Sequence, residues 1–265
     1  MKIQGRTFVI SGGASGLGRA CAQEICQNGG NAAILDLNED QGTSTVEELG
    51  ASQSRFWPCD VTSSESIASA VAGIVEWTET TGKALAGVIP AAGVGIPGLI
   101  IDKNYNPLPL STIDFVMGIN LRGTLDLVRQ ALPHLARAPP DASGSDGERG
   151  VIIMVASAAA FEGQMGQVAY AASKGAVAAM TLPMARDLSW FGIRVVTIAP
   201  SAFETAMTAL MSDKVRRGLE KAMEFPPRPG KPSEFATLAR HIIENVMLNG
   251  VVIRLDGATR MPSKL

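Results

Sequence analysis

Runs of successive apolar residues alternate along this chain with longer segments of helical periodicity. Seven short apolar runs are predicted to be strands: 7–11, 31–36, 54–61, 85–93, 151–157, 193–200 and 250–257. Most are apolar at consecutive positions, which is typical of parallel strands buried on both faces. Helix-length segments lie between them, at 16–28, 64–81, 111–137, 168–191 and 233–247. This alternation predicts an α/β fold with a Rossmann-type, doubly wound parallel sheet and helices on both faces.

No linker interrupts the pattern, so residues 1–265 are predicted to form a single domain. Its cofactor half covers about 1–150, and its catalytic and substrate half covers about 151–265. Two stretches rich in Pro, Gly and Asp, 95–111 and 138–150, are predicted to be surface loops. The segment 202–230 carries Met207, Met211 and Met223, whose adaptable side chains suit a lid over an apolar ligand. A segment that only packs the core is an equally good interpretation.

The composition excludes several classes of protein. Lys and Arg number 23 against 25 Asp and Glu, and a formal charge of -2 disfavours a nucleic-acid partner. Three cysteines without a CxxC pair and two distant histidines predict neither a disulfide framework nor a metal site, and favour a reducing compartment. No apolar run is long enough to span a membrane. The chain enters its first strand within a few residues, so we expect no signal or transit peptide.

A glycine-rich stretch follows the first predicted strand and opens the first helix. Gly12, Gly16 and Gly18 allow the backbone to turn sharply and to approach a pyrophosphate closely. The helix N-terminus then offers free N–H groups to that anion. Glycines alone are common in turns, but the strand–turn–helix context makes this signal strong. The predicted cofactor contacts in this loop are Ser11, Gly12, Ser15, Gly16, Leu17 and Gly18.

Two acidic residues at strand ends predict how the rest of a dinucleotide is held. Asp36 ends the second strand, 18 residues after Gly18, where a carboxylate accepts both ribose hydroxyls and repels a 2′-phosphate. Leu37 follows it, in the place where an NADP enzyme would have a basic residue. The cofactor is therefore predicted to be NAD. Asp60 and Val61 end the third strand and are predicted to line the adenine, although Asp60 also suits a helix N-terminal turn.

A possible catalytic group lies in the second half of the chain. Tyr170 and Lys174 are four residues apart and share one face of a helix, and Ser157 ends the strand before it. A phenol has a pKa of about 10, which a neighbouring cation lowers. Such a trio suits proton transfer at an alcohol or carbonyl while a hydride moves to or from nicotinamide. Considered without their context, these residues are better explained as a buried Tyr on an amphipathic helix and a solvated Lys.

These motifs resemble the short-chain dehydrogenase/reductase family along nearly the whole chain. Ser11 to Gly18 match its Thr-Gly-x-x-x-Gly-x-Gly motif, with Ser11 in the place of Thr. The resemblance implies a catalytic tetrad of Asn120, Ser157, Tyr170 and Lys174, with Tyr170 and Lys174 also contacting the cofactor. It also implies nicotinamide-side contacts from Ala92, Gly93, Pro200 and Thr205.

Two longer stretches, 150–188 and 225–261, resemble a subgroup of that family, the type 2 3-hydroxyacyl-CoA dehydrogenases, also called 17β-hydroxysteroid dehydrogenases type 10. This likeness implies NAD-dependent interconversion of (S)-3-hydroxyacyl-CoA and 3-ketoacyl-CoA, a role in β-oxidation and a homotetramer. It also implies that Gln164 and Gln167 line the substrate pocket with Ser157 and Tyr170. A ketoreductase or alcohol dehydrogenase for a steroid, polyketide or other secondary metabolite is an alternative. A non-catalytic scaffold is another, which an intact tetrad disfavours.

The chain departs from the family in three places near the nicotinamide. Pro90 and Ala91 replace two Asn residues at the end of the fourth strand, Ala86 replaces an Asp, and Ser201 replaces the Gly after Pro200. A proline cannot donate to a sheet ladder. The substrate is therefore the least determined part of this prediction.

The chain ends in Ser263, Lys264 and Leu265. At a free C-terminus this tripeptide is read by the peroxisomal import receptor. We therefore expect a peroxisomal location, with a cytoplasmic or mitochondrial one as the alternative.

Overall fold

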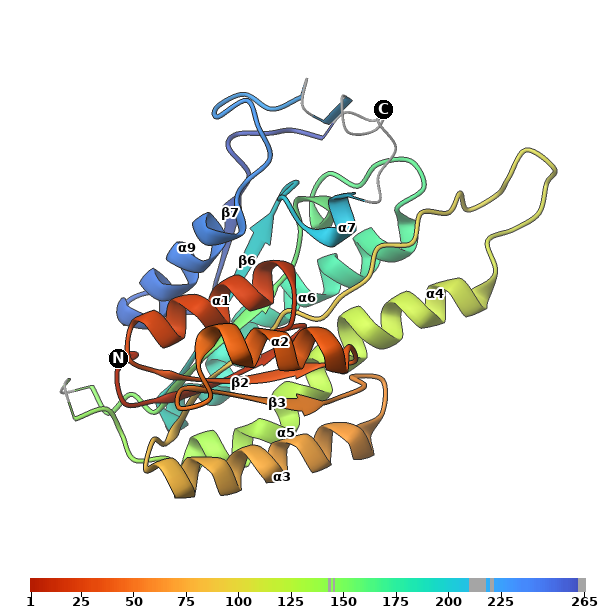
Figure 1. The fold of residues 1–265 in the computed structure, drawn as a ribbon. Coiled ribbons are helices and arrows are strands. Elements are labelled where there is room, and N and C mark those ends of the chain that lie inside the picture. Colours follow the sequence, from red (N-terminus) through yellow and green to blue (C-terminus); the bar gives the residue numbers. More distant parts are fainter. Residues whose placement is uncertain (143, 145, 210–217, 220–221, 262–265) are drawn as a thin grey trace.

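Seven parallel strands form one sheet in the order β3-β2-β1-β4-β5-β6-β7 (Figure 1), in a computed structural model of the chain. The structure describes residues 1–142, 144, 146–209, 218–219 and 222–261. The strands are β1 (Thr7–Ser11), β2 (Asn31–Asp36), β3 (Ser54–Pro58), β4 (Leu85–Pro90), β5 (Gly150–Val155), β6 (Ile193–Pro200) and β7 (Val251–Leu255). The predicted doubly wound parallel sheet is confirmed.

The described helices flank this sheet on both faces (Figure 1). They are α1 (Gly16–Gln27), α2 (Glu39–Leu49), α3 (Ser64–Thr81), α4 (Leu110–Met117), α5 (Thr124–Arg137), α6 (Val168–Leu188), α7 (Ala206–Ala209) and α9 (Pro232–Glu244). Shorter turns are η1 (Gly118–Gly123), η2 (Ala158–Ala160) and η3 (Ser189–Phe191).

The strand order indicates where a ligand site is expected. The chain runs from β1 outward to β3 and then returns to β4 on the other side of β1, so β1 pairs with both β2 and β4. In open α/β sheets, ligands bind beyond the carboxyl ends of the strands at such a switch point. Most of the predicted site residues lie at these carboxyl ends or in the loops and helices that follow them.

Each face of the sheet has its own apolar core, because side chains alternate along a strand. Val9, Val88 and Ile152 point toward α3, α5 and α6. Phe8, Ile89 and Ile153 point toward α1 and α9. Burial on both faces explains why the strands are apolar at consecutive positions, as their sequence indicated.

Strands β3, β4, β5 and β7 end two or three residues before their expected ends, so Asp60 and Val61 follow β3 and do not end it. Two helical features also differ from the expected elements. The predicted helix 111–137 is interrupted by η1, a π-helical segment, which separates α4 from α5. The pattern of apolar residues did not predict helix α2, because its sequence EDQGTSTVEEL has few apolar residues. The buried face of α2 consists of Gly42 and Thr45. Small side chains suffice there because Phe56 of β3 lies directly against Gly42.

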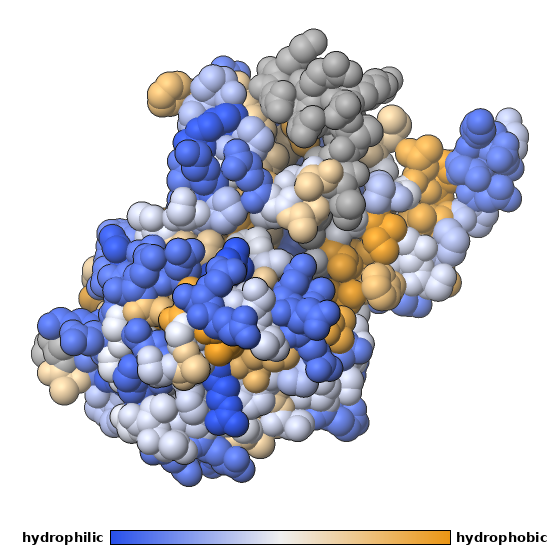
Figure 2. Space-filling view, in the orientation of Figure 1, coloured by the Kyte–Doolittle hydropathy of each residue, from blue (hydrophilic) through white to orange (hydrophobic). Residues whose placement is uncertain are grey.

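The expected loop 95–111 forms an arm that projects from the body of the protein before α4 begins (Figure 1). Ile101 pairs with Pro107 within the arm, and Gly98 pairs with Gln167 in the loop before α6. Figure 2 shows apolar residues along this arm, among them Leu99, Ile100 and Ile101, which are about half exposed. The other expected loop connects α5 to β5 and covers 138–149.

The segment 202–230, expected to be either a lid or a core-packing segment, lies only partly within the described residues. Met223 is buried and contributes to the core, whereas Met211 and the side chain of Met207 lie outside the described part of the chain. Within the described residues, no helix is long and apolar enough to cross a membrane, and no cluster of three metal-binding side chains is present.

Candidate functional site

The glycine loop between β1 and α1 turns so tightly that side chains would not fit at Gly12 and Gly18. Gly12 has a φ of +64°, and a Cβ there would lie 2.8 Å from the Ala92 nitrogen. A Cβ on Gly18 would collide with the carbonyl oxygen of Gly12. Gly16 also has a positive φ, of +50°. Only glycine tolerates such positions, because L side chains rarely adopt a positive φ.

Helix α1 begins at this loop without a side-chain cap. Ser15 is its N-cap residue but accepts no hydrogen bond from the first turn through its side chain. The first N–H groups of α1 are therefore left for a ligand, and the positive end of the helix dipole favours an anion there. These features fit the pyrophosphate of a dinucleotide, as predicted from the motif.

Asp36 lies at the carboxyl end of β2, one strand away from the glycine loop. Its two carboxylate oxygens accept hydrogen bonds from the backbone nitrogens of Ala14 (3.2 Å) and Asn38 (3.2 Å). These contacts hold the carboxylate at the strand edge, where adenosine ribose hydroxyls would meet it. Leu37 beside it is 68% exposed, and the nearby cation Arg19 forms an ion pair with Glu48.

Asp60 lies in a turn before helix α3, which was the alternative to its predicted adenine contact. One of its carboxylate oxygens accepts hydrogen bonds from the Thr62 nitrogen (2.8 Å) and hydroxyl (2.7 Å), as in a turn that precedes a helix. Val61 lies against Gly123 at the end of η1. An adenine contact from Asp60 and Val61 stays a prediction.

The residues expected beside the nicotinamide come from two loops. Ala92 donates to the Ser11 hydroxyl (3.3 Å), and Gly93 lies next to two members of the tetrad. A Cβ at Gly93 would lie 3.2 Å from Asn120 Oδ1 and 3.4 Å from Lys174 Nζ, so a side chain would narrow this space. Pro200 ends β6, and the Thr205 methyl packs against Gly16.

Ser157, Tyr170 and Lys174 converge beyond the end of β5. Ser157 is buried directly after that strand, and Tyr170 is in the first turn of α6. Burial raises the pKa of the Tyr170 phenol, and a hydrogen bond with the Ser157 hydroxyl partly opposes this rise. The sequence predicted a pKa lowered by Lys174. That prediction was wrong for the protein alone, because desolvation of the phenol dominates.

Lys174 is positioned by the strand end as well as by its own helix. Its ammonium group donates to the Val155 carbonyl (2.8 Å) and lies 5.9 Å from the centre of the Tyr170 ring. Burial lowers the pKa of this lysine from 10.5 to about 8. It is therefore a buried residue rather than the solvated Lys of the alternative interpretation.

Asn120 is fully buried in η1 and joins three segments. Its side-chain oxygen accepts from the Val94 nitrogen (2.8 Å), and its side-chain nitrogen donates to the Val94 carbonyl (2.9 Å) and to Ser173 Oγ (3.0 Å). Ser173 in turn donates to the Tyr170 carbonyl (2.7 Å). The π-helical turn thus directs Asn120 toward Tyr170's helix. Its predicted role of holding a water that relays the proton stays a prediction.

Gln164 and Gln167 lie in the loop between Ser157 and α6, with both side chains partly exposed. The Gln167 side-chain oxygen accepts from the Gln164 nitrogen (3.0 Å), and Gly98 of the arm donates to Gly166 (2.8 Å). This loop is therefore an ordered element that the arm holds on one side.

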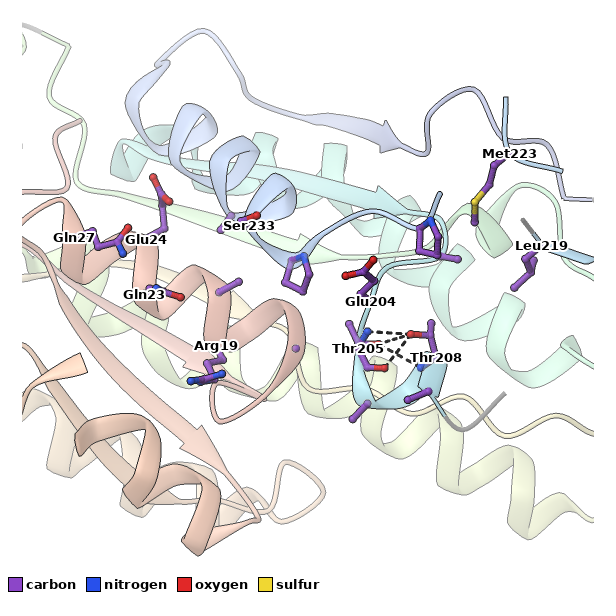
Figure 3. Close-up of a pocket in the computed structure, with 18 residues that line it drawn as sticks. Arg19, Gln23, Glu24, Gln27, Glu204, Thr205, Thr208, Leu219, Met223 and Ser233 are labelled. Atoms are coloured by element: carbon purple, nitrogen blue, oxygen red, sulfur yellow. Dashed lines mark hydrogen bonds between the residues drawn. The ribbon is translucent and has the colours of Figure 1, made fainter. Parts of the chain in front are cut away.

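A cavity of about 780 Å³ lies between α1, residues 202–209 and the start of α9 (Figure 3). Gly16 and Thr205 border it, but Ser157 and Tyr170 do not. It is therefore separate from the catalytic group, on the α9 side of the glycine loop.

The sequence did not predict two contacts near this site: the hydrogen bond of Ser173 to the Tyr170 carbonyl and the ion pair of Glu162 with Arg254. Ser173 lies three residues after Tyr170, and an i, i+3 hydrogen bond was foreseeable from that spacing. Glu162 contacts residues near the C-terminus, and nothing in the local sequence indicates a contact across about 90 positions.

Comparison with known proteins agrees with this geometry. Residues 6–216 match the family described as short chain dehydrogenase. The bovine 3-hydroxyacyl-CoA dehydrogenase type-2 is 43% identical, over 98% of this chain and 97% of that protein, and the human one is 42% identical over the same shares. A crystal structure of 3-hydroxyacyl-CoA dehydrogenase type-2 from Mycobacterium avium is 34% identical, covers all of both chains and has a TM-score of 0.88.

A more distant solved structure also matches. The 3-ketoacyl-(acyl-carrier-protein) reductase from Brucella melitensis, complexed with NADH, is 25% identical over 97% of this chain and 99% of that one, with a TM-score of 0.80. The glycine loop, the Ser157–Tyr170–Lys174 group and these full-length matches agree with one another. The chain therefore belongs to the short-chain dehydrogenase family, whose members are NAD(P)-dependent oxidoreductases.

Proposed function

We propose that the protein oxidises (S)-3-hydroxyacyl-CoA to 3-ketoacyl-CoA with NAD, and catalyses the reverse reduction. The observation that carries this proposal is the Ser157–Tyr170–Lys174 group, in which Ser157 and Lys174 are buried and Tyr170 is partly buried, in a chain 42–43% identical to mammalian 3-hydroxyacyl-CoA dehydrogenases type-2 along its length. A bound nicotinamide cofactor supplies the hydride acceptor. The chain's own residues supply the proton acceptor and the positioning of the alcohol.

Each residue then has one task. Tyr170 takes the proton of the substrate hydroxyl at its phenolic oxygen, and the Ser157 hydroxyl holds the substrate oxygen beside it. Lys174 contributes positive charge below the Tyr170 ring, which favours the phenolate. Asn120 fixes the backbone of Val94 and the helix of Tyr170 relative to each other. Burial of Ser157 and Lys174 lowers the local dielectric and strengthens their electrostatic contacts with Tyr170.

The preference for NAD over NADP rests on Asp36. Its carboxylate is fixed at the end of β2, and a 2′-phosphate there would meet a negative charge beside the apolar Leu37. Replacing Asp36 with Ala and Leu37 with Arg is expected to shift the ratio of kcat/KM toward NADP. Wild-type protein that already prefers NADPH would contradict this interpretation of Asp36.

A substrate panel tests the proposed activity. Purified protein is assayed with NADH and 3-ketoacyl-CoA esters of increasing chain length, and in parallel with steroid ketones and simple aliphatic ketones. Turnover of the acyl-CoA esters is expected to dominate. Faster turnover of a steroid or another ketone would support the alternative enzyme, and inactivity throughout would support a scaffold. Tyr170→Phe is the control: it should lose about 10²–10⁴ in rate while still binding NADH.

We also propose that the protein acts in β-oxidation inside peroxisomes. The support is the tripeptide Ser263–Leu265 together with the proposed acyl-CoA substrate, since the import receptor reads Ser-Lys-Leu at a free C-terminus. These residues lie outside the described part of the chain, so the proposal rests on sequence alone.

A homotetramer is proposed from the family resemblance and from two exposed apolar faces. One follows the arm and α4 and includes Leu110 and Phe115; the other surrounds the edge strand β7 and includes Met247 and Val251. Exposed apolar surface of this extent is typical of interfaces. Two separate faces would allow each chain to contact more than one copy.

A further inference from the structure

Residues 158–167, here called the substrate loop, connect Ser157 to the helix of Tyr170. Two backbone hydrogen bonds order the start of this loop. The Ala160 nitrogen donates to the Ser157 carbonyl (3.0 Å), and the Glu162 nitrogen donates to the Ala158 carbonyl (3.0 Å). The arm holds the far end of the loop through Gly98 and Gly166. The side chain of Glu162 makes a further contact that anchors the loop.

Glu162 binds Arg254 of β7 through both carboxylate oxygens. Arg254 Nη1 lies 2.8 Å from Glu162 Oε1, and Nη2 lies 3.2 Å from Oε2. The same guanidinium lies 5.4 Å from the centre of the Phe161 ring, in the substrate loop. A paired bidentate contact of this kind fixes direction as well as distance, because both groups are planar.

A second layer of charges supports this pair. Asp256 accepts from Arg254 Nε (2.6 Å) and from Arg260 Nη1 (3.2 Å). Arg260 also lies 3.3 Å from Glu162, and the Met261 backbone nitrogen donates to Glu162 Oε2 (3.0 Å). Arg254 lowers the pKa of Glu162, and Glu162 raises the pKa of Arg254. The carboxylate therefore stays ionised at neutral pH.

The position of Arg254 links two parts of the site. Arg254 pairs with Ala199 of β6, adjacent to Pro200, and the next residue, Leu255, accepts from Ser201 (3.2 Å). Glu162 is two residues before Gln164 in the substrate loop. The pair thus connects the end of β6, where the nicotinamide is expected, with the loop expected to hold the substrate.

We propose that Glu162 is a positioning residue: through Arg254 it sets the distance between the substrate loop and the cofactor end of β6. The proposal rests on the proposed function only for the identity of the substrate. Isolated surface ion pairs contribute little, but this one is bidentate, about three-quarters buried and part of a network. Loss of its charge should free the loop without removing any group that touches the reacting atoms.

The test compares wild-type protein with Glu162→Gln and Arg254→Lys. Glu162→Gln keeps the size of the side chain and loses its charge; Arg254→Lys keeps the charge and loses the planar fork. For each, KM for the acyl-CoA should rise about 5- to 10-fold, while kcat and KM for NADH change less than about twofold. The double variant should be no worse than either single variant, since both remove the same contact.

Hydrogen exchange provides a readout that needs no substrate. Backbone amides of 158–167 should exchange faster in both variants than in wild-type protein. Asp126→Asn is the matched control, since it removes a carboxylate that accepts from Arg129 (2.6 Å and 2.9 Å) on α5. Should the acyl-CoA panel fail, the KM comparison moves to the panel's best ketone, and the exchange result is unaffected.

Two outcomes would overturn the proposal. One is unchanged loop exchange and unchanged KM in both variants. The other is a parallel fall of kcat for every substrate that Asp126→Asn reproduces, which would indicate a general loss of folded protein rather than of loop position.

Discussion

At the scale of single residues, burial favours the uncharged forms of both Tyr170 and Lys174. The pKa of the phenol is raised and that of the lysine is lowered to about 8, in each case mainly by desolvation. Both shifts work against the phenolate that alcohol oxidation needs. The Ser157 hydroxyl is the group whose hydrogen bond offsets the rise for Tyr170.

Replacement of Ser157 with Ala should therefore change the pH dependence as well as the rate. Oxidation requires ionised Tyr170, so kcat/KM should increase with pH until the phenol has ionised. Without the hydrogen bond that lowers its pKa, this increase should move to higher pH, and the rate at neutral pH should fall about 10- to 100-fold. The measurement is kcat/KM across a pH series. An unchanged profile would show that Ser157 acts only on the substrate.

Replacement of Lys174 with Met should abolish most activity yet stabilise the fold at neutral pH, because it removes a buried charge. Between pH 8 and 10.5 the unfolded chain holds a proton on Lys174 that the folded chain has lost. The free energy of unfolding of the wild-type protein therefore rises with pH in this window. The difference in stability between the variant and the wild-type protein should become smaller there. Thermal denaturation at several pH values measures this difference. An advantage that grows from pH 8 to 10.5 would contradict the assigned shift.

At the scale of elements, Pro90 shows how a departure from the family is accommodated. The Ala91 backbone nitrogen donates to the Ser11 carbonyl of β1 (3.1 Å). Successive backbone N–H groups of a strand point to opposite sides, so the N–H that Pro90 lacks would point toward β5. The paired residues of β4 and β5 end at Val88 and Ile152, before Pro90 is reached. The missing donor thus lies where the ladder has already stopped. Ala86, another departure, is fully buried in β4.

Pro90→Asn should be tolerated, with a change in Tm of only a few degrees and with activity retained. The variant supplies an N–H that the site does not require, and it keeps the contact between β4 and β1. Differential scanning calorimetry and NADH binding test this together. Complete loss of NADH binding would identify Pro90 as a functional adaptation.

At the scale of the whole molecule, assembly and location remain to be measured. Light scattering with size-exclusion chromatography should give four times the mass of one chain. Val251→Lys places a charge in the apolar face around β7. It should convert the tetramer to a smaller assembly, because burying an unpaired lysine in an interface is unfavourable. Leu37→Lys, at an exposed position directly after β2, controls for the added charge. A wild-type monomer would exclude the tetramer.

Location is tested with a fluorescent protein fused to the N-terminus. The fusion should collect in peroxisomes, and deletion of Ser263–Leu265 should leave it diffuse in the cytosol. An intact fusion in the cytosol or in mitochondria would remove the tripeptide's support for a role in β-oxidation.

The sequence by itself determined the sheet and the glycine loop. These depend on local patterns: strands buried on both faces are continuously apolar, and a tight phosphate turn requires glycine. The spacing of Tyr170 and Lys174 put them on one face of a helix, but only the resemblance to a family assigned them, with Ser157, a catalytic role. Segments with weak local signals were missed, such as α2, whose helix depends on small residues packing against Phe56.

Only the tertiary structure decided how these groups are tuned. Whether a phenol is more or less acidic depends on its burial, and the spacing of Tyr170 and Lys174 does not contain that information. The π-helical turn at Asn120 and the pairing of Glu162 with Arg254 join residues about 50 and 90 positions apart. Such contacts form only when the fold brings distant segments together, so no local pattern predicts them.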